Sequence, residues 1–281
     1  MPLIHFTLLV LSTIMIAAAG NIINDYFDTR IDRINKPNEV IVGRSVKRRV
    51  AMTAHMLLSG GGLLIGAYVA WRSELMQWVW IPAFSIGALW VYSTNLKRSL
   101  VIGNGLVATL TALVPLTVGL YEIPMLARYF STPKVIMAHG GQFVMEPSFF
   151  MELWYWVLAY ALFAFLSTLV RELQKDMADV KGDEAVGCRT VPIVWGMKWA
   201  KALALLHTGL IVAMLLTVRS LALHDRFSFW YIGVGIIGPL LLSAGFTYNA
   251  QSRKEHLRAG HLMKVAMVMA VLYALFIRHL K

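Results

Sequence analysis

Six aspartates form two triads with the same spacing, D-x-x-D-x-x-x-D, at well-separated places in the chain. They are Asp25, Asp28, Asp32, Asp176, Asp179 and Asp183. On a helix, positions i, i+3 and i+7 share one face, so each triad would point three carboxylates the same way. Like charges on one face repel each other and weaken the helix that carries them. The triads instead suit a hard divalent cation such as Mg²⁺, which binds carboxylate and phosphate oxygens.

The chemistry expected of two such triads is the departure of a diphosphate group. If the triads face each other, they can hold a diphosphate ester between them through magnesium ions. The ions would stabilise the negative charge that develops as the C–O bond breaks. If the carbon left behind is allylic, it becomes a delocalised cation, which an apolar pocket with aromatic faces can hold away from water.

Further polar residues accompany the triads. Asn24 lies four positions before Asp28, so it joins the polar face of the first triad. Tyr92, Lys97 and Arg98 lie where a later apolar segment ends. A Lys-Arg pair at such a place often does no more than reach the membrane surface. Beside two metal sites, the same pair becomes a candidate contact for the diphosphate.

The triads could also be ordinary charged loops at the ends of membrane spans. A carboxylate pair at about 4 Å, with an effective dielectric constant near 20, repels by on the order of 4 kcal/mol. Both triads begin where an apolar segment ends, and they share one spacing. We therefore favour the metal-binding interpretation.

The elements that must position these residues are membrane-spanning helices. The 281-residue chain is 58% hydrophobic and only 15% charged, whereas a soluble protein carries nearer a quarter charged residues. Apolar stretches of about 17–25 residues can cross a bilayer. The sequence has eight, at residues 3–22, 48–70, 77–95, 100–120, 149–170, 198–218, 228–248 and 262–280. We therefore predict an all-α, multi-span membrane bundle of eight helices.

The net charge of +11 follows the membrane topology and does not indicate a nucleic-acid partner. Four segments that share one side hold 19 of the 26 Lys and Arg residues; they are 24–49, 95–98, 171–201 and 249–264. By the positive-inside rule this side is cytoplasmic. Both triads are then expected to face the cytoplasm, in a multi-pass protein of the plasma membrane. The single cysteine, Cys188, excludes an internal disulfide and a cysteine-based metal site.

One irregular stretch, residues 121–148, divides the chain into halves of about 1–120 and 149–281. Its prolines and its Gly140-Gly141 pair predict an irregular cap or an interfacial helix on the outer side. Each half carries one triad, and internal repeats are common in membrane proteins. We expect a single domain, residues 1–281, built from two related four-helix halves.

At these motifs the sequence resembles the UbiA superfamily of intramembrane prenyltransferases. Residues 24–32 are similar to the first aspartate-rich motif of the family, residues 179–183 to the second, and residues 92–98 to its basic element. The order of the motifs and their placement relative to the spans agree through essentially the whole chain. The resemblance implies a helical bundle around a central cavity that opens to the cytoplasm.

The resemblance also implies the partners and the roles of the residues. Mg²⁺ would lie between the two motifs, the donor would be a prenyl diphosphate, and the acceptor would be a lipid-soluble molecule in the membrane. The six aspartates would bind the metal, with Asp28 and Asp179 as catalytic carboxylates. The expected contacts to the diphosphate are Asn24, Lys36, Tyr92, Lys97, Arg98 and Lys175.

Within the superfamily, residues 24–37 and 175–183 are most similar to the geranylgeranylglycerol-phosphate geranylgeranyltransferase branch. That similarity implies transfer of a geranylgeranyl group to the hydroxyl of a phosphoglycerol ether lipid. Prenylation of an aromatic quinone precursor is the alternative, because other branches share the metal motifs. The family has nine spans, with its first motif after the second span. Here that motif follows the first apolar segment, so we expect one N-terminal helix of the family pattern to be missing.

Two other classes of membrane protein use acidic residues. An ion or lipid transporter would carry charges near the middle of its spans, whereas these acids cluster at one membrane face. A CDP-alcohol phosphotransferase needs D-G-x-x-A-R between its aspartates, and here Asp28 is followed by Thr29 and Arg30. The residues therefore favour prenyl transfer.

Overall fold

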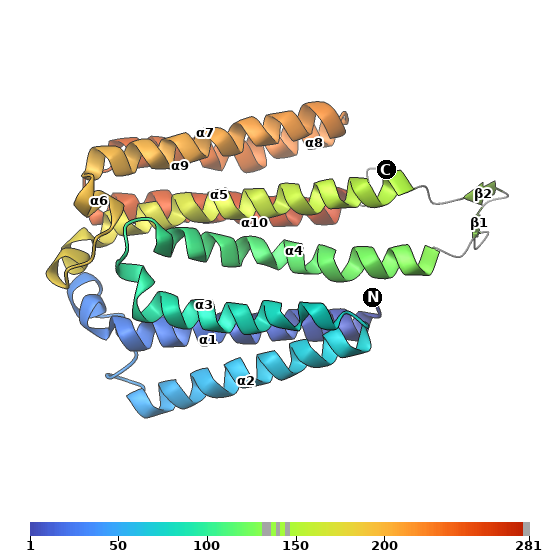
Figure 1. The fold of residues 1–281 in the computed structure, drawn as a ribbon. Coiled ribbons are helices and arrows are strands. Elements are labelled where there is room, and N and C mark those ends of the chain that lie inside the picture. The colour runs from blue at the N-terminus through green and yellow to red at the C-terminus, as the bar shows by residue number, and fades with distance from the viewer. Residues whose placement is uncertain (131–135, 139–140, 144–146, 278–281) are drawn as a thin grey trace. The chain divides into compact units, whose positions relative to one another are not determined.

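The structure, a computed structural model, describes residues 1–130, 136–138, 141–143 and 147–277 (Figure 1). The longer helices are α1 Leu3–Asn35, α2 Arg48–Arg72, α3 Trp80–Thr94, α4 Ile102–Phe130, α5 Pro147–Ala185, α7 Met197–Ala222, α9 Gly238–Asn249 and α10 Arg253–Ile277. The shorter ones are η1 Met76–Val79, η2 Leu96–Arg98, α6 Val191–Val194, α8 Arg226–Trp230 and the π-helical η3 Tyr231–Ile237. The strands β1 Ile136–Ala138 and β2 Gly141–Phe143 form one antiparallel pair. Apart from this pair, the prediction of an all-α fold is confirmed.

Among the described residues, seven helices are long and apolar enough to cross a membrane. They are Leu3–Asn35, Arg48–Arg72, Ile102–Phe130, Phe149–Ala185, Met197–Ala222, Arg226–Asn249 and Arg253–Phe276. The predicted span 77–95 forms η1 followed by α3, whose 15 residues rise only about 22 Å, against a hydrocarbon core of about 30 Å. The count of eight spans therefore stays a prediction. Residues 278–280 of the last predicted span lie outside the described residues.

Helix α4 is longer than the sequence suggested. An irregular stretch was predicted to begin at residue 121, but residues 121–130 are still helical. The helix contains two prolines, Pro115 and Pro124. A proline removes one helical hydrogen bond, but neighbouring helices and side chains make this tolerable in membrane helices. The predicted cap falls in part on residues 131–135, 139–140 and 144–146, which lie outside the described residues.

The chain forms two compact units. Unit 1 contains Met1–Thr29, Glu39–Thr94 and Leu110–Leu162, and unit 2 contains Arg30–Asn38, Asn95–Thr109 and Phe163–Lys281. Helices α1, α4 and α5 each contribute residues to both units. The predicted repeat of two four-helix halves stays a prediction.

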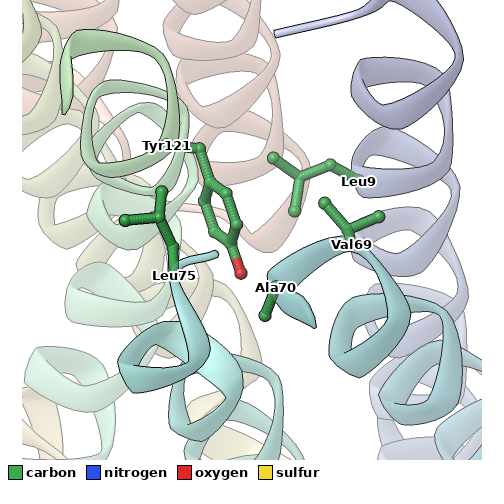
Figure 2. Packing of buried hydrophobic residues seen from close by; sticks show 5 residues of the cluster. All are labelled: Leu9, Val69, Ala70, Leu75 and Tyr121. Atoms are coloured by element: carbon green, nitrogen blue, oxygen red, sulfur yellow. The ribbon is translucent and has the colours of Figure 1, made fainter. Parts of the chain in front are cut away.

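The core of unit 1 surrounds Tyr121 of α4. Its side chain is 1% exposed and packs among Leu9, Val69, Ala70 and Leu75, which come from α1, α2 and the turn after α2 (Figure 2). Aromatic rings bury a large apolar area at one point. This cluster therefore ties the second half of α4 to α1 and α2 within unit 1.

Unit 2 is joined by a buried polar network around Gln174 of α5. Helix α9 packs against both α7 and α10 (Figure 1). The Gln174 side chain is 1% exposed and donates to Ser243 Oγ at 2.9 Å and to Thr247 Oγ1 at 2.8 Å, both on α9. Ser243 in turn donates to the carbonyl of Ala259 on α10 at 2.9 Å. These hydrogen bonds join α5, α9 and α10 and so favour one rotation of α5 about its axis, although Gln174 Oε1 has no partner among the described residues.

Candidate functional site

The first triad lies on the last third of α1. The helix ends at Asn35, as Pro37 predicts, because the residue before a proline disfavours the helical conformation. In unit 1, Asp28 is only 4% exposed, and its Oδ2 accepts a hydrogen bond from Asn24 Nδ2 at 2.7 Å. Asn24, one turn earlier, therefore holds the Asp28 carboxylate in place.

Arg48, the first residue of α2, lies beside this part of α1. Its guanidinium is 4.0 Å from the centre of the Tyr26 ring, and its Nη1 donates to Thr29 Oγ1 at 3.2 Å. An arginine stacked on an aromatic ring keeps its charge and most of its donors. The sequence showed a basic run after the first motif, but not that one of its arginines packs against the motif itself.

The third aspartate of the first triad, Asp32, belongs to unit 2. Lys36 Nζ lies 3.4 Å from Asp32 Oδ2, one turn further on. Both side chains are partly exposed, so the pair contributes little to stability. Its consequence is local: Lys36, a predicted diphosphate contact, lies directly beside a predicted metal ligand.

The second triad lies on the last part of α5, and each member has a different neighbour in unit 2. Asp176 Oδ2 accepts a hydrogen bond from Asn104 Nδ2 of α4 at 2.7 Å. Asp179 Oδ1 lies 3.4 Å from Arg253 Nη2, at the start of α10. Asp183 is 6% exposed, and its backbone carbonyl accepts from the amide of Cys188 at 2.9 Å. That contact closes the turn after α5.

Asn35 connects the end of α1 to α5, between Asp179 and Asp183. Its Nδ2 donates to the backbone carbonyl of Asp179 at 3.2 Å, and its Oδ1 accepts from the amide of Gly182 at 3.0 Å. A β-carbon on Gly182 would lie 2.6 Å from Asn35 Cγ. Glycine is therefore required for this approach, which fixes the backbone that carries the second triad.

The predicted basic element divides between the two units. Tyr92 is buried on α3 in unit 1, whereas Lys97 and Arg98 form η2 in unit 2. The backbone carbonyl of Arg98 accepts from the amide of Arg189 at 3.0 Å. This bond joins η2 to the turn that follows the second triad. Lys175 is half-buried on α5, directly before Asp176.

The donors at these positions fit a hard divalent cation. They are carboxylates, which such cations prefer, and Asp28 and Asp183 are both largely buried. Within the described residues, no three His, Cys, Asp or Glu side chains gather around one point. The carboxylates are instead distributed along helices, an arrangement suited to a ligand such as diphosphate that supplies further oxygens.

Sequence reasoning missed four residues that position the triads: Asn35, Asn104, Gln174 and Arg253. Asn35 was visible only as part of the first motif. Asn104 and Gln174 could have been noticed in the sequence, because each places a carboxamide beside or within an apolar segment. A polar group there needs a hydrogen-bond partner. Arg253 had no such signal, because it lies in a basic segment at a membrane boundary.

Comparisons with known proteins agree with the motifs. The profile of the UbiA prenyltransferase family matches residues 1–272. Digeranylgeranylglyceryl phosphate synthase of Thermococcus sibiricus is 28% identical, over 96% of this chain and 84% of its own length. The protein of that name from Methanothermobacter thermautotrophicus is 30% identical, over 94% of this chain and 82% of its own.

Two solved structures share the fold. One, reported for digeranylgeranylglyceryl phosphate synthase in membranes, superposes with a TM-score of 0.60 at 20% identity, covering 97% of this chain and 85% of its own. The apo structure of a UbiA homolog from Aeropyrum pernix K1 gives 0.68 at 13% identity, covering 98% and 91%.

Proposed function

This chain belongs to the UbiA prenyltransferase family, and on that premise we propose that it transfers a geranylgeranyl group from its diphosphate to the hydroxyl of geranylgeranylglyceryl phosphate. It is a multi-pass membrane prenyltransferase, which sets aside the interpretation as a transporter. The choice of acceptor rests on sequence similarity, over nearly the whole chain, to relatives named digeranylgeranylglyceryl phosphate synthase. Prenyl transfer in this family generally depends on a divalent metal.

The two triads are proposed to hold Mg²⁺ and the diphosphate of the donor. The proposed ligands are Asp25, Asp28, Asp32, Asp176, Asp179 and Asp183. When bound there, magnesium would neutralise the negative charge of the departing diphosphate. Asp28 and Asp179, as the middle members, are proposed to contribute most. Asn24 supports this role for Asp28, because it orients that carboxylate through a 2.7 Å hydrogen bond.

Basic and polar side chains near the triads are proposed to bind the remaining diphosphate oxygens. They are Asn24, Lys36, Tyr92, Lys97, Arg98 and Lys175. Lys36 lies beside Asp32, and Lys175 immediately precedes Asp176. Cations placed beside the leaving group stabilise the charge that it acquires. The apolar helices would exclude water from the allylic cation, so that the acceptor hydroxyl captures it.

The proposed location is the plasma membrane, with the active site open to the cytoplasm. The support is the charge distribution: 19 of the 26 Lys and Arg residues occur in the segments that share a side with the triads. Positive loops remain on the cytoplasmic side during insertion. A soluble prenyl diphosphate could then reach the triads from the cytoplasm, while the lipid acceptor enters from the bilayer.

The test is an assay of membranes supplied with Mg²⁺, radiolabelled geranylgeranyl diphosphate and geranylgeranylglyceryl phosphate, with the product identified by mass. We expect the doubly prenylated ether lipid from the wild-type protein and no turnover from Asp28→Ala or Asp179→Ala. Asp225→Asn, an acidic residue far along the chain from both triads, serves as the matched control and should retain activity. If a product forms only with an aromatic quinone precursor, that precursor is the acceptor instead of geranylgeranylglyceryl phosphate. Near-normal rates in either triad variant would refute the roles of the aspartates.

A further inference from the structure

A cavity of about 610 Å³ lies in unit 2 beside the last part of α5. Met177 and Lys181 line it from α5, Asn35 from the end of α1, and Arg253 and His256 from the start of α10. Successive residues on a helix are rotated by about 100°, so positions 177 and 181 point away from position 179. None of the three aspartates of the second triad lines the cavity, although Arg253 and Asn35, which do line it, both contact Asp179.

The charged residues that line this cavity are basic. Lys181, Arg253 and His256 line it, and none of the described lining residues is acidic. Two acids lie nearby: Asp179 pairs with Arg253, and the carboxylate of Glu255 accepts hydrogen bonds from the amides of Gln251 and Ser252 at the start of α10. Lys181 has no ion pair recorded within the described part of the chain. The wall of the cavity thus carries two basic side chains and, among the described lining residues, no acidic one.

Two buried nitrogen atoms at the cavity have no hydrogen-bond partner among the described residues. They are Nδ1 of His256, whose side chain is 3% exposed, and Nε of Arg253. Buried polar groups in folded proteins almost always have a partner, so an unsatisfied pair on one cavity wall indicates a missing acceptor. An anion oxygen accepts from both an arginine N–H and a protonated ring nitrogen.

We propose that this cavity binds a phosphate group. Arginine and lysine together suit a phosphate, which offers several strong acceptor oxygens to a planar guanidinium and a mobile ammonium. The volume lies within the range of small-molecule sites. Ile34, Met177 and Met197 form an apolar part of the lining, which fits a phosphate monoester with a carbon substituent. Both a lipid headgroup and free phosphate offer this chemistry.

The first arm of the test measures the binding of inorganic phosphate to purified protein in detergent, by calorimetry, with a chelator present so that the triads hold no metal. Loss of one charge-assisted hydrogen bond should raise the Kd of Lys181→Gln by about tenfold. Lys254→Gln is the matched control: Lys254 is an exposed lysine of α10 outside the lining, and its Kd should stay close to that of the wild-type protein. Lys181 is itself exposed, so its replacement should not disturb folding, and thermal unfolding without phosphate checks this.

The second arm uses nanodiscs of phosphatidylcholine with a minor fraction of phosphatidic acid, and counts the lipids retained on the protein by native mass spectrometry. Loss of phosphatidic acid from Lys181→Gln, but not from Lys254→Gln, would support the proposal with a lipid headgroup as the source. A dependence on Lys181 for inorganic phosphate alone would support it with a soluble anion. The proposal is overturned if the two variants behave alike in both arms. Neither arm needs prenyl transfer, so failure here leaves the proposed enzyme activity unaffected.

Discussion

The carboxamide of Asn35 and the backbone of Gly182 are in direct contact, with the Gly182 amide donating to Asn35 Oδ1 at 3.0 Å. The other end of the same carboxamide donates to the carbonyl of Asp179 at 3.2 Å. One side chain at the end of α1 thereby bonds to the backbone of α5 at two residues, Asp179 and Gly182. The relation couples the helix of the first triad to the helix of the second without using any carboxylate.

Replacing Asn35 with alanine should destabilise the protein by about 1–3 kcal/mol, because two partly buried backbone groups lose a partner. Turnover should also fall, since the backbone that carries Asp179 and Asp183 is less constrained. Thermal unfolding in detergent and the prenyl-transfer assay give the two readouts. Asn38→Ala is the control, because Asn38 is exposed in the loop after α1. Equal effects of the two substitutions would contradict the role of Asn35.

Gly182→Ala should have a similar cost for a steric reason. The new β-carbon would lie 2.6 Å from Asn35 Cγ, so Asn35 must leave its position. Gly105→Ala is the matched control, because nothing lies within 4 Å of a β-carbon there, and alanine in a helix is favoured over glycine by about 0.5–1 kcal/mol. In the Asn35→Ala background the cost of Gly182→Ala should shrink, with a coupling energy of about 0.5–3 kcal/mol. Strict additivity of the two changes would exclude a direct clash.

Local features of the fold could be predicted from the sequence, whereas these long-range contacts could not. The helical spacing of the aspartates and the effect of Pro37 on the end of α1 are local properties, and the observed helices carry the triads as the spacing required. The Asn35–Gly182 contact joins residues far apart in the chain, and nothing in either segment alone identifies the partner. The count of eight spans stays a prediction for another reason: residues 77–95 are largely apolar, but the chain begins there with the 3-10 turn η1, which leaves α3 only 15 residues.

Arg253 should compete with a divalent metal for Asp179. An ion pair at this partly exposed position contributes about 0.2–1 kcal/mol, so Arg253→Gln should strengthen metal binding by no more than about fivefold. Calorimetry with Mn²⁺ in the absence of donor measures this directly. Arg258→Gln, one turn further along α10 and exposed, controls for the general loss of positive charge. A weaker metal affinity in Arg253→Gln than in Arg258→Gln would contradict competition.

Asp225 should give α8 a pH-dependent stability. Its Oδ1 accepts from the amide of Ser228 at 2.7 Å, and hydrogen bonds from the Ser228 side chain and backbone hold the pKa of the Asp225 carboxyl below its ordinary value. A carboxyl whose pKa is lower in the folded state stabilises the fold above its unfolded pKa and loses that effect as the pH falls. Asp225→Ala should therefore cost about 1 kcal/mol near neutral pH, and the difference should begin to shrink below about pH 4 and be lost as the pH falls through the lowered pKa of the folded state.

Unfolding of the wild-type protein, Asp225→Ala and Asp225→Asn at neutral and acidic pH checks this prediction. Asparagine also caps helices but does not titrate, so its small cost should not change with pH. If the alanine variant is equally destabilised at both pH values, the carboxylate charge plays no part in the cap.

The uninterrupted course of α1 through residue 32 has a consequence for how its carboxylates can be used. Helical residues advance about 1.5 Å each, so the first and last aspartates of a triad are about 10 Å apart along the axis. A magnesium ion reaches its ligands at only about 2 Å, which is too short to gather both ends of the row. One ion therefore cannot bind the first and last aspartates of a triad together, and under the proposed function each ion would use neighbouring aspartates of the row.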